Sequence, residues 1–367
     1  MAKKKDDAKE IKKVLKDKKD NKKEKKEEEE QIYVSSGSYL LDLALSEQKD
    51  GGYLLGSVIQ ISAKDHVGKT LMALNMFAEA KNNKKFKDYK LILDEPEAAM
   101  NFPLDKMYGK GMKKRMTFVP TPEERVSPRT VQDWYHSITN EKNYPCIYVL
   151  DSFDALTSDD DLNLKGDPGK GGYHLEKAIV ASSTFPKIIG PLAKTNSLFF
   201  WISQTRANLG MGMEDDTESG GRAIKFYRSY YIKLKKIQTL TKMVRGKKIV
   251  VGNMVEITIK KNKVTGKIRT ITIPIYNDYG IDDLESMVDW LCERDFWDKP
   301  KKSAWIDCLG DFSKGLDKDG NEKRWTRKEL ILHIETEKLQ QKLRGILYEK
   351  WMQYESEICT DREPRYV

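Results

Sequence analysis

The chain has 367 residues, of which 39% are hydrophobic and 34% charged, and its formal net charge is +9 at neutral pH. This composition suits a soluble globular protein of one large domain or two to three units, and no run approaches the ~18 consecutive apolar residues of a membrane span. The N-terminus lacks the apolar core of a signal peptide and the four cysteines are widely spaced, which excludes a secreted disulfide framework, argues against structural zinc and favours a reducing, cytoplasmic compartment.

The chain opens with a highly charged segment. Residues 1–30 hold 13 Lys and 10 Asp or Glu and almost no apolar residues. This pattern is typical of a solvated arm, and the alternative is a basic arm that touches nucleic acid or a neighbouring subunit. We therefore predict a separate N-terminal arm over residues 1–34.

Residues 35–285 alternate between apolar runs of strand length and helical patterns. One helical pattern places Val131, Trp134, Tyr135 and Ile138 on one face. Near-continuous apolar strands separated by helices predict an α/β fold with a mostly parallel twisted sheet covered on both faces. The expected strands are residues 58–62, 91–95, 117–119, 146–151, 198–203, 230–234, 254–259 and 271–275.

The character of the chain changes after about residue 285. Leu284, Met287, Val288 and Leu291 form a helical stripe, and the segment that begins at Thr326 reads as a capping box that opens a last helix. We predict a small, mainly helical C-terminal domain over residues 286–367.

The first strand of the core runs directly into a phosphate-loop pattern. Backbone N–H groups of such a loop hold phosphate oxygens, its lysine reaches the terminal phosphates, and its threonine binds Mg²⁺. The pattern usually opens with glycine, and alanine here would cost about 1–2 kcal/mol if the position were left-handed. Read alone, Gly-Lys-Thr can merely open a helix. The loop residues are Ala63, Lys64, Asp65, His66, Val67, Gly68, Lys69 and Thr70.

Three polar features follow other strands, at the edge where an open α/β sheet binds ligands. Asp151 can hold Mg²⁺ through water, although it can also cap a turn. The acidic run 94–97 can supply a base for an attacking water, and spacing does not decide which acid acts. Gln204 can sense a γ-phosphate, although it can also be a surface glutamine at a strand end.

As an ordered set, the blocks over about residues 35–300 resemble the RecA family of DNA recombinases. The most diagnostic block is Gly220-Gly221-Arg222-Ala223-Ile224-Lys225-Phe226-Tyr227. Further blocks are Ser36-Gly37-Ser38-Tyr39-Leu40-Leu41-Asp42-Leu43-Ala44-Leu45, the phosphate loop, Glu95-Pro96-Glu97-Ala98-Ala99, Leu150-Asp151-Ser152-Phe153-Asp154-Ala155-Leu156-Thr157, Ser203-Gln204 and Lys261-Asn262-Lys263. The segments at 1–30 and beyond 300 depart from bacterial RecA, and the Lys- and Asn-rich, compact layout is more like a phage-encoded member.

The resemblance implies a RecA-type phosphate-loop ATPase core that uses ATP and Mg²⁺. It implies a DNA-dependent ATPase that forms helical filaments on single-stranded DNA and exchanges strands with duplex DNA, in the nucleoid or in the cytoplasm of a phage-infected host. Recombination mediators and single-strand-binding proteins are further expected partners. The implied roles are Glu97 as catalytic glutamate, Gln204 as γ-phosphate sensor, Thr70 and Asp151 as Mg²⁺ ligands, and Lys261 and Lys263 as lysines that reach ATP across a subunit boundary.

The resemblance also implies two DNA-binding loops, at about residues 158–173 and 205–219. Glycines let backbone N–H groups approach phosphates, lysines add charge, and methionines can wedge between bases. Acidic triplets beside these contacts are unfavourable for DNA binding. The expected DNA-binding residues are Lys165, Lys170, Arg206, Asn208, Met211, Met213 and Arg222.

Two other functions remain open at this point. One is a RecA-core helicase motor, against which the block at 220–227 argues. The other is an ATP-binding, non-catalytic recombinase paralogue, for which Ala63 is the main support.

Overall fold

The computed structural model describes residues 31–97, 100–121, 128–141, 144–158, 173–206, 217–218, 225–300, 304–316, 318, 320, 323–360 and 362. Tyr33–Val367 form one compact unit. The predicted arm over residues 1–34 lies almost wholly outside the described residues. The predicted boundary at residue 285 remains a prediction.

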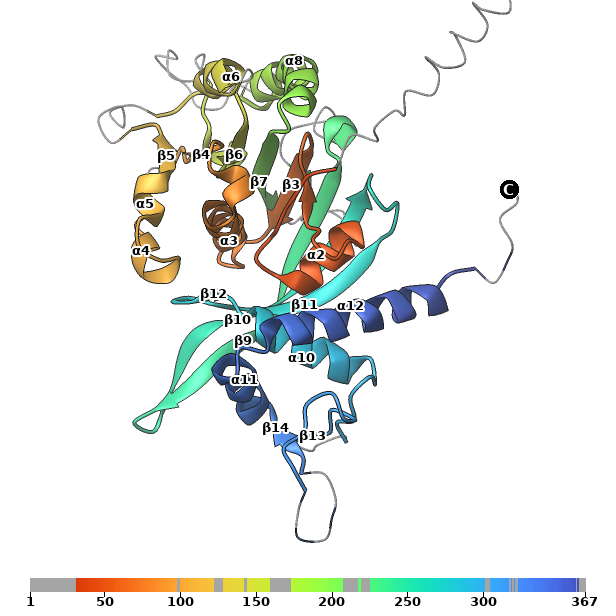
Figure 1. The fold of residues 1–367 in the computed structure, drawn as a ribbon. Helices are drawn as coiled ribbons and strands as arrows, with labels where there is room; N and C mark the ends of the chain where they lie inside the picture. Colours follow the sequence, from red (N-terminus) through yellow and green to blue (C-terminus); the bar gives the residue numbers. More distant parts are fainter. Residues whose placement is uncertain are drawn as a thin grey trace, which may run out of the picture. The chain divides into compact units, whose positions relative to one another are not determined.

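The fold is α/β, as predicted, and is built on a large mixed sheet (Figure 1). Within the described residues the sheet has ten strands in the order β12-β11-β10-β9-β3-β7-β6-β4-β5, and β8 pairs with β7. The run from β9 to β5 is parallel, and β9 to β12 form an antiparallel edge. The strands are β3 (Val58–Ala63), β4 (Lys90–Asp94), β5 (Met116–Val119), β6 (Cys146–Leu150), β7 (Leu198–Arg206), β8 (Thr217–Glu218), β9 (Tyr230–Val244), β10 (Lys247–Asn262), β11 (Arg269–Tyr276) and β12 (Gly280–Ile281).

Strand β6 is apolar along its whole length, and both of its faces are buried. In β6, Cys146, Tyr148 and Leu150 belong to the core under α6 (Val131–Asn140) and α8 (Tyr173–Lys194). The alternate residues of β6 are equally buried. Burial on both faces is what a continuous apolar run predicts.

The predicted core helices are present. In α6, Val131, Trp134 and Ile138 are buried and Tyr135 is half-buried, and a Thr130–Asp133 capping box begins the helix. Helix α3 (Lys69–Asn82) begins directly after the phosphate loop and contacts β3 and β7. The remaining elements of this part are β1 (Tyr33–Val34), α2 (Tyr39–Ser46), β2 (Tyr53–Leu54), η2 (Lys84–Phe86), α4 (Leu104–Met107), α5 (Met112–Arg115) and η5 (Phe153–Ala155).

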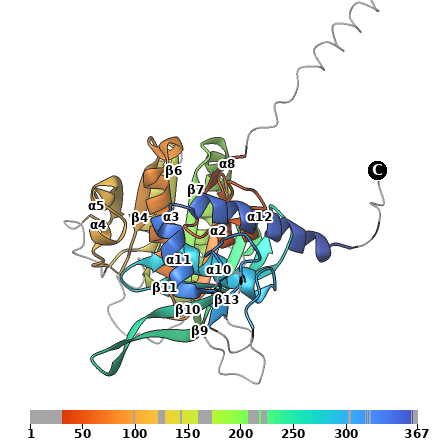
Figure 2. The ribbon, with the colours of Figure 1, turned by 60° about the horizontal axis from the view of Figure 1, so that its bottom comes forward.

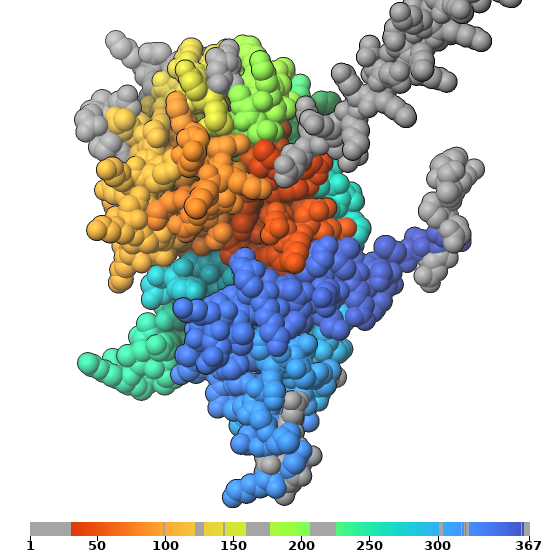
Figure 3. Space-filling model, viewed as in Figure 1, coloured from red at the N-terminus to blue at the C-terminus, as the bar shows by residue number. Residues whose placement is uncertain are grey.

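Strands β9 and β10 are much longer than the predicted segments 230–234 and 254–259. The part of β9 beyond Lys235 and the part of β10 up to Val250 are largely exposed, and they form an arm that stands clear of the surface (Figures 2 and 3). The arm packs on no core, so its sequence carries no sustained in–out alternation that would mark it as strand. Its exposed apolar residues are Ile237, Met243, Val244, Ile249 and Val250.

The two predicted C-terminal helices are present as α10 (Asp283–Glu293) and α11 (Arg327–Thr336). A third helix that was not predicted separately, α12 (Gln340–Glu357), follows α11, and β13 (Trp305–Ile306) and β14 (Trp325–Thr326) form a small hairpin. The Thr326–Glu329 capping box forms as expected. Glu355 of α12 is buried and forms ion pairs with Lys267 and Arg269, which ties this helix to the edge of the sheet. Among the described helices, none combines the length and apolar character needed to cross a membrane.

Candidate nucleotide-binding site

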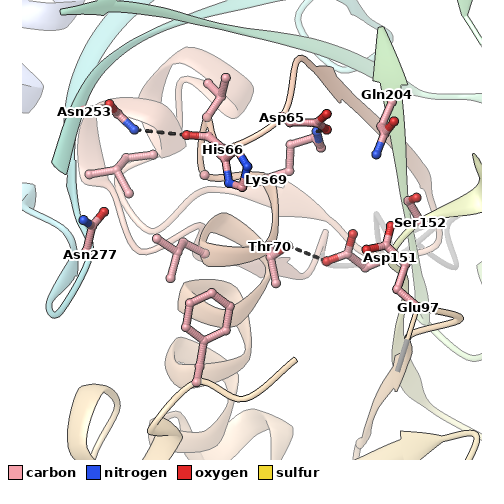
Figure 4. A pocket seen from close by; sticks show the side chains of 15 residues that line it. Asp65, His66, Lys69, Thr70, Glu97, Asp151, Ser152, Gln204, Asn253 and Asn277 are labelled. Atoms are coloured by element: carbon pink, nitrogen blue, oxygen red, sulfur yellow. Dashed lines mark hydrogen bonds and ion pairs between the residues drawn. The ribbon is translucent and has the colours of Figure 1, made fainter. Parts of the chain in front are cut away.

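A cavity of about 560 Å³ opens at the carboxyl ends of β3, β6 and β7 (Figure 4). This is the edge at which open α/β sheets bind ligands. It gathers the phosphate loop, the residues that follow β4, β6 and β7, and side chains from the antiparallel edge of the sheet. The lining residues are Asp65, His66, Val67, Gly68, Lys69, Thr70, Leu71, Glu97, Phe102, Asp151, Ser152, Gln204, Asn253, Ile275 and Asn277.

Ala63, where the phosphate-loop pattern usually has glycine, is not left-handed. Ala63 is the buried last residue of β3, and the left-handed residues of the loop are His66 (φ 58°) and Gly68 (φ 108°). The expected cost of alanine at position 63 therefore does not arise. Gly68 caps α3 without a side-chain hydrogen bond, which leaves the N–H groups of the first helical turn for an anion.

Lys69 is folded back onto the loop. Its Nζ donates to the carbonyls of Ala63 (3.1 Å) and Lys64 (2.9 Å) and lies 3.9 Å from the carboxylate of Asp65. Burial lowers the pKa of Lys69, and the carboxylates of Asp65 and Asp151 counter this shift. The ammonium thus sits in a partly desolvated pocket where a phosphate would be a strong partner.

Thr70 and Asp151 provide two oxygen atoms at one point. The Thr70 hydroxyl donates to Asp151 Oδ2 at 2.5 Å. Burial raises the pKa of Asp151, the hydrogen bond from Thr70 lowers it, and the nearby Glu97 raises it further. Hydroxyl and carboxylate oxygens are ligands that Mg²⁺ prefers, so this pair fits the expected ion.

The acids after β4 have different environments. Asp94 is fully buried, where Arg129 binds both of its oxygens (2.6 and 2.8 Å) and the Tyr148 hydroxyl donates to it. Burial raises the pKa of Asp94, whereas Arg129 lowers it. Asp94 is therefore engaged in a structural network. Glu95 is buried, while Glu97 is exposed and lines the cavity.

Gln204 lines the cavity from β7, beside Asp151 and Ser152 (Figure 4). Its backbone N–H donates to Asp154 Oδ2 at 2.7 Å. The preceding Ser203 is buried and accepts a hydrogen bond from Gln60, which also binds Arg228. This buried polar network joins the end of β7 to the residues just before β9.

Lys261 and Lys263 lie away from this cavity. Lys261 is near the end of β10, where its Nζ donates to the carbonyls of Lys225 (2.9 Å) and Phe226 (3.5 Å). Burial lowers the pKa of Lys261, and the charges of Lys263 and Arg228 lower it further. Lys261 is thus beside Lys225 and Phe226, and neither Lys261 nor Lys263 lines the cavity of its own chain.

The predicted DNA contacts lie outside what the structure describes. Lys165, Lys170, Asn208, Met211, Met213 and Arg222 are not among the described residues, and Arg206 is described only as backbone at the end of β7.

Four lining residues carried no signal in the sequence: Phe102, Asn253, Ile275 and Asn277. Asn253 and Asn277 lie on the side of the loop opposite Asp151 and Gln204 (Figure 4). They belong to β10 and to the turn after β11. Their approach depends on how the antiparallel edge curves over the loop, which no local motif encodes.

A mostly parallel sheet, a Gly-Lys-Thr loop at its carboxyl edge and a helix that begins in that loop define the class of phosphate-loop α/β proteins. The model of the RecA N-terminal domain matches residues 5–282, and the chain belongs to the RecA family. The resemblance noted in the sequence is thereby confirmed.

Curated relatives agree with this assignment. Protein RecA of Borrelia hermsii is 29% identical over 320 residues, which cover 86% of this chain and 82% of the relative. Protein RecA of Staphylococcus aureus is 30% identical over 76% of this chain and 74% of the relative, and that of Colwellia psychrerythraea is 27% identical over the same shares. Membership supports the general activity of a RecA-type recombinase, a DNA-dependent ATPase that uses ATP with Mg²⁺.

Proposed function

We propose that this chain is an ATP-dependent recombinase that assembles as a helical filament on single-stranded DNA, pairs it with homologous duplex and exchanges strands. One observation carries the proposal. Lys69, Thr70, Asp151, Glu97 and Gln204 come from four separate segments of the chain, and they line a single cavity. Each is of the residue type that phosphoryl transfer needs at that place.

The proposed roles follow from position and charge. Lys69 and the N–H groups at the start of α3 hold the phosphates, and they neutralise charge that develops during transfer. Thr70 and Asp151 hold Mg²⁺, which supplies Lewis-acid polarisation of the phosphate oxygens.

Glu97 is the acid that orients and deprotonates the attacking water. It lines the cavity, whereas Asp94 is locked to Arg129. Gln204 contacts the γ-phosphate, and its backbone hydrogen bond to Asp154 links it to η5, which precedes the proposed first DNA-binding loop.

We propose that Lys261 and Lys263 complete the site of the neighbouring subunit. Their place at the far end of β10 from Asn253 supports action in trans, because Asn253 already lines the cavity of its own chain. Charge donated by a partner makes hydrolysis depend on assembly, as an arginine finger in trans does.

The proposed partners are single- and double-stranded DNA, further copies of this chain, mediators and single-strand-binding proteins, and the proposed location is the cytoplasm. DNA binding should weaken steeply with salt and show little sequence preference, because phosphate contacts release counterions and carry little base information.

Neither alternative function gains support. The non-catalytic paralogue rested on Ala63, and Ala63 is extended strand with a carbonyl that accepts from Lys69. The chain belongs to the RecA family and its matched relatives are RecA proteins, which supports a recombinase more than a helicase motor.

A strand-exchange assay tests the proposal. Circular single-stranded DNA is incubated with linear duplex, either homologous or unrelated, together with ATP and Mg²⁺. We expect joint molecules only with the homologous duplex, and none from Lys69→Ala. Unwinding of the unrelated duplex would indicate the helicase motor. Nucleotide binding with neither turnover nor exchange would indicate the paralogue.

A further inference from the structure

One contact links the phosphate loop to the antiparallel edge of the sheet. The side-chain amide of Asn253, in β10, donates through Nδ2 to the backbone carbonyl of His66 at 3.0 Å (Figure 4). His66 is a left-handed, non-glycine residue in the middle of the loop. The left-handed conformation of such a residue costs about 1–2 kcal/mol relative to the right-handed one, so the hydrogen bond from Asn253 can offset part of this cost.

The backbone around Asn253 is shaped to make this contact. Register shifts flank it, one at Val250/Gly252 and one at Met254/Val255. Bulges bend a strand and re-aim side chains, and they are frequent next to active sites. The carbonyl of Val251, the extra residue of the first shift, accepts from the N–H of Asn277 (2.9 Å), which also lines the cavity.

Gly252 keeps this bend close to β11. A Cβ added at Gly252 would lie 2.3 Å from the carbonyl oxygen of Ile275, which is far inside any permitted contact. Ile275 is the cross-strand partner of Asn253 on β11, so the two side chains share one face of the sheet. That face covers the loop, because Ile275 reaches within 3.0 Å of a Cβ placed on Gly68.

We propose that Asn253 is a positioning residue of the phosphate loop, which holds the His66 peptide in the orientation that binds the nucleotide's phosphates. The proposal rests on the proposed function of the cavity. In a trans peptide the carbonyl and the next N–H point in opposite directions, so a fixed His66 carbonyl also fixes the N–H of Val67. Aimed N–H groups are what a phosphate loop offers to its ligand.

The Asn253 hydrogen bond stabilises at His66 the left-handed conformation that glycine would adopt readily. Without the Asn253 bond, His66 favours right-handed conformations, and the fraction of loops ready to bind falls; the apparent affinity falls in proportion. Glycine populates the left-handed region about as readily as the right-handed one, so a loop with glycine at position 66 needs the bond much less.

A double-mutant cycle on the full-length chain tests this. Affinity for a fluorescent N-methylanthraniloyl-ATP with Mg²⁺ is measured for the unaltered chain, Asn253→Ala, His66→Gly and the double variant. Lys69→Ala tests the nucleotide site itself. Gln238→Ala, an exposed amide on β9, serves as the matched control. Asn253→Thr is a second variant that keeps strand propensity, and thermal unfolding checks that each protein folds.

We expect Asn253→Ala to weaken binding about 5- to 10-fold, which is within the contribution of one neutral hydrogen bond. The KM for ATP should rise by the same factor at unchanged kcat, since the loop contacts ground and transition states alike. The double variant should bind within about 2-fold of His66→Gly alone. Gln238→Ala should match the unaltered chain.

Other outcomes separate the two proposals. If Lys69→Ala abolishes binding while Asn253→Ala and Asn253→Thr leave it unchanged, Asn253 does not position the loop, and the nucleotide site stands. An equal loss from Asn253→Ala in both backgrounds also overturns the inference, because the effect would then not pass through His66. If the unaltered chain itself binds no nucleotide, the proposed function fails and the inference fails with it.

Discussion

The lysine pair at the end of β10 offers the sharpest test of action across a subunit boundary. Lys261 lies eight positions (261 − 253) beyond Asn253, the residue of β10 that lines the cavity. In a straight strand with ~3.3 Å per residue the two Cα atoms would be at most about 26 Å apart, and the register shifts of β10 shorten this distance. Neither Lys261 nor Lys263 lines the cavity of its own chain. We therefore expect any direct contact of these lysines with ATP to be made with the ATP of a neighbouring subunit.

The perturbation is the double substitution Lys261→Ala, Lys263→Ala. This variant should bind ATP as a monomer, because its cavity is intact, and it should lose DNA-dependent hydrolysis by as much as about 10³–10⁵-fold, the range of a charge supplied in trans. Lys233→Ala, a lysine of β9 outside the cavity, is the matched control and should hydrolyse ATP normally.

Mixing two inactive variants tests whether the lysines act across the interface. The lysine variant keeps Glu97, and the Glu97→Gln variant keeps both lysines. An interface between the two proteins can therefore hydrolyse ATP only when the lysine variant supplies the cavity and the Glu97→Gln variant supplies the lysines. With random, equal co-assembly in head-to-tail contacts, roughly one quarter of the interfaces are competent. ATPase activity of the mixture on single-stranded DNA should therefore recover to about one quarter of the unaltered protein. No recovery, in a mixture whose co-assembly is demonstrated by energy transfer between labelled subunits, would refute the reasoning.

Three further predictions concern single residues. Glu97→Gln should bind ATP normally and hydrolyse it about 10²–10⁴-fold more slowly in a single-turnover assay, whereas the same loss in Glu95→Gln would move the base to the buried acid. Ala63→Gly should change nucleotide affinity by less than about 3-fold and lower the unfolding free energy by about 0.5–1 kcal/mol, because Ala63 is extended strand; a large loss of affinity would contradict that geometry. Burial raises the pKa of Asp42 to about 7. The stabilisation that comes from the protonated Asp42 is present in full below pH 3.8 and is lost as the pH rises through 7. The Tm of the unaltered chain relative to Asp42→Asn should therefore fall from pH 4 to 7 and then level off. A Tm difference that rises over this range would contradict the raised pKa.

The parallel core was predictable because its signals are local. Apolar runs such as 146–150 are buried on both faces, and Asp151 follows β6 as the sequence predicted. The packed parts of β9, β10 and β11 were predicted, but the exposed extension of β9 and β10 was not, because it buries no face and so carries no sustained alternation.

The same distinction holds in the cavity. Lys69 and Thr70 belong to a contiguous motif whose geometry follows from a strand, a loop and a helix start. The cost of Ala63 could not be decided from the sequence, because the motif does not say which of its residues are left-handed, and these are His66 and Gly68. Asn253 lines the cavity next to a bulge in β10, and the Arg129 contact that engages Asp94 is a tertiary one, so no local pattern encodes either feature.

The central claim is that this cavity hydrolyses ATP when the protein assembles on single-stranded DNA. Its most direct test is the steady-state ATPase rate of the full-length chain with and without single-stranded DNA, beside Lys69→Ala, with electron microscopy of the same mixtures. We predict strong stimulation by DNA, filaments in those samples, and no turnover by Lys69→Ala, because nothing nearby replaces the charge of that lysine. Turnover that ignores DNA, or that survives in Lys69→Ala, would contradict the account.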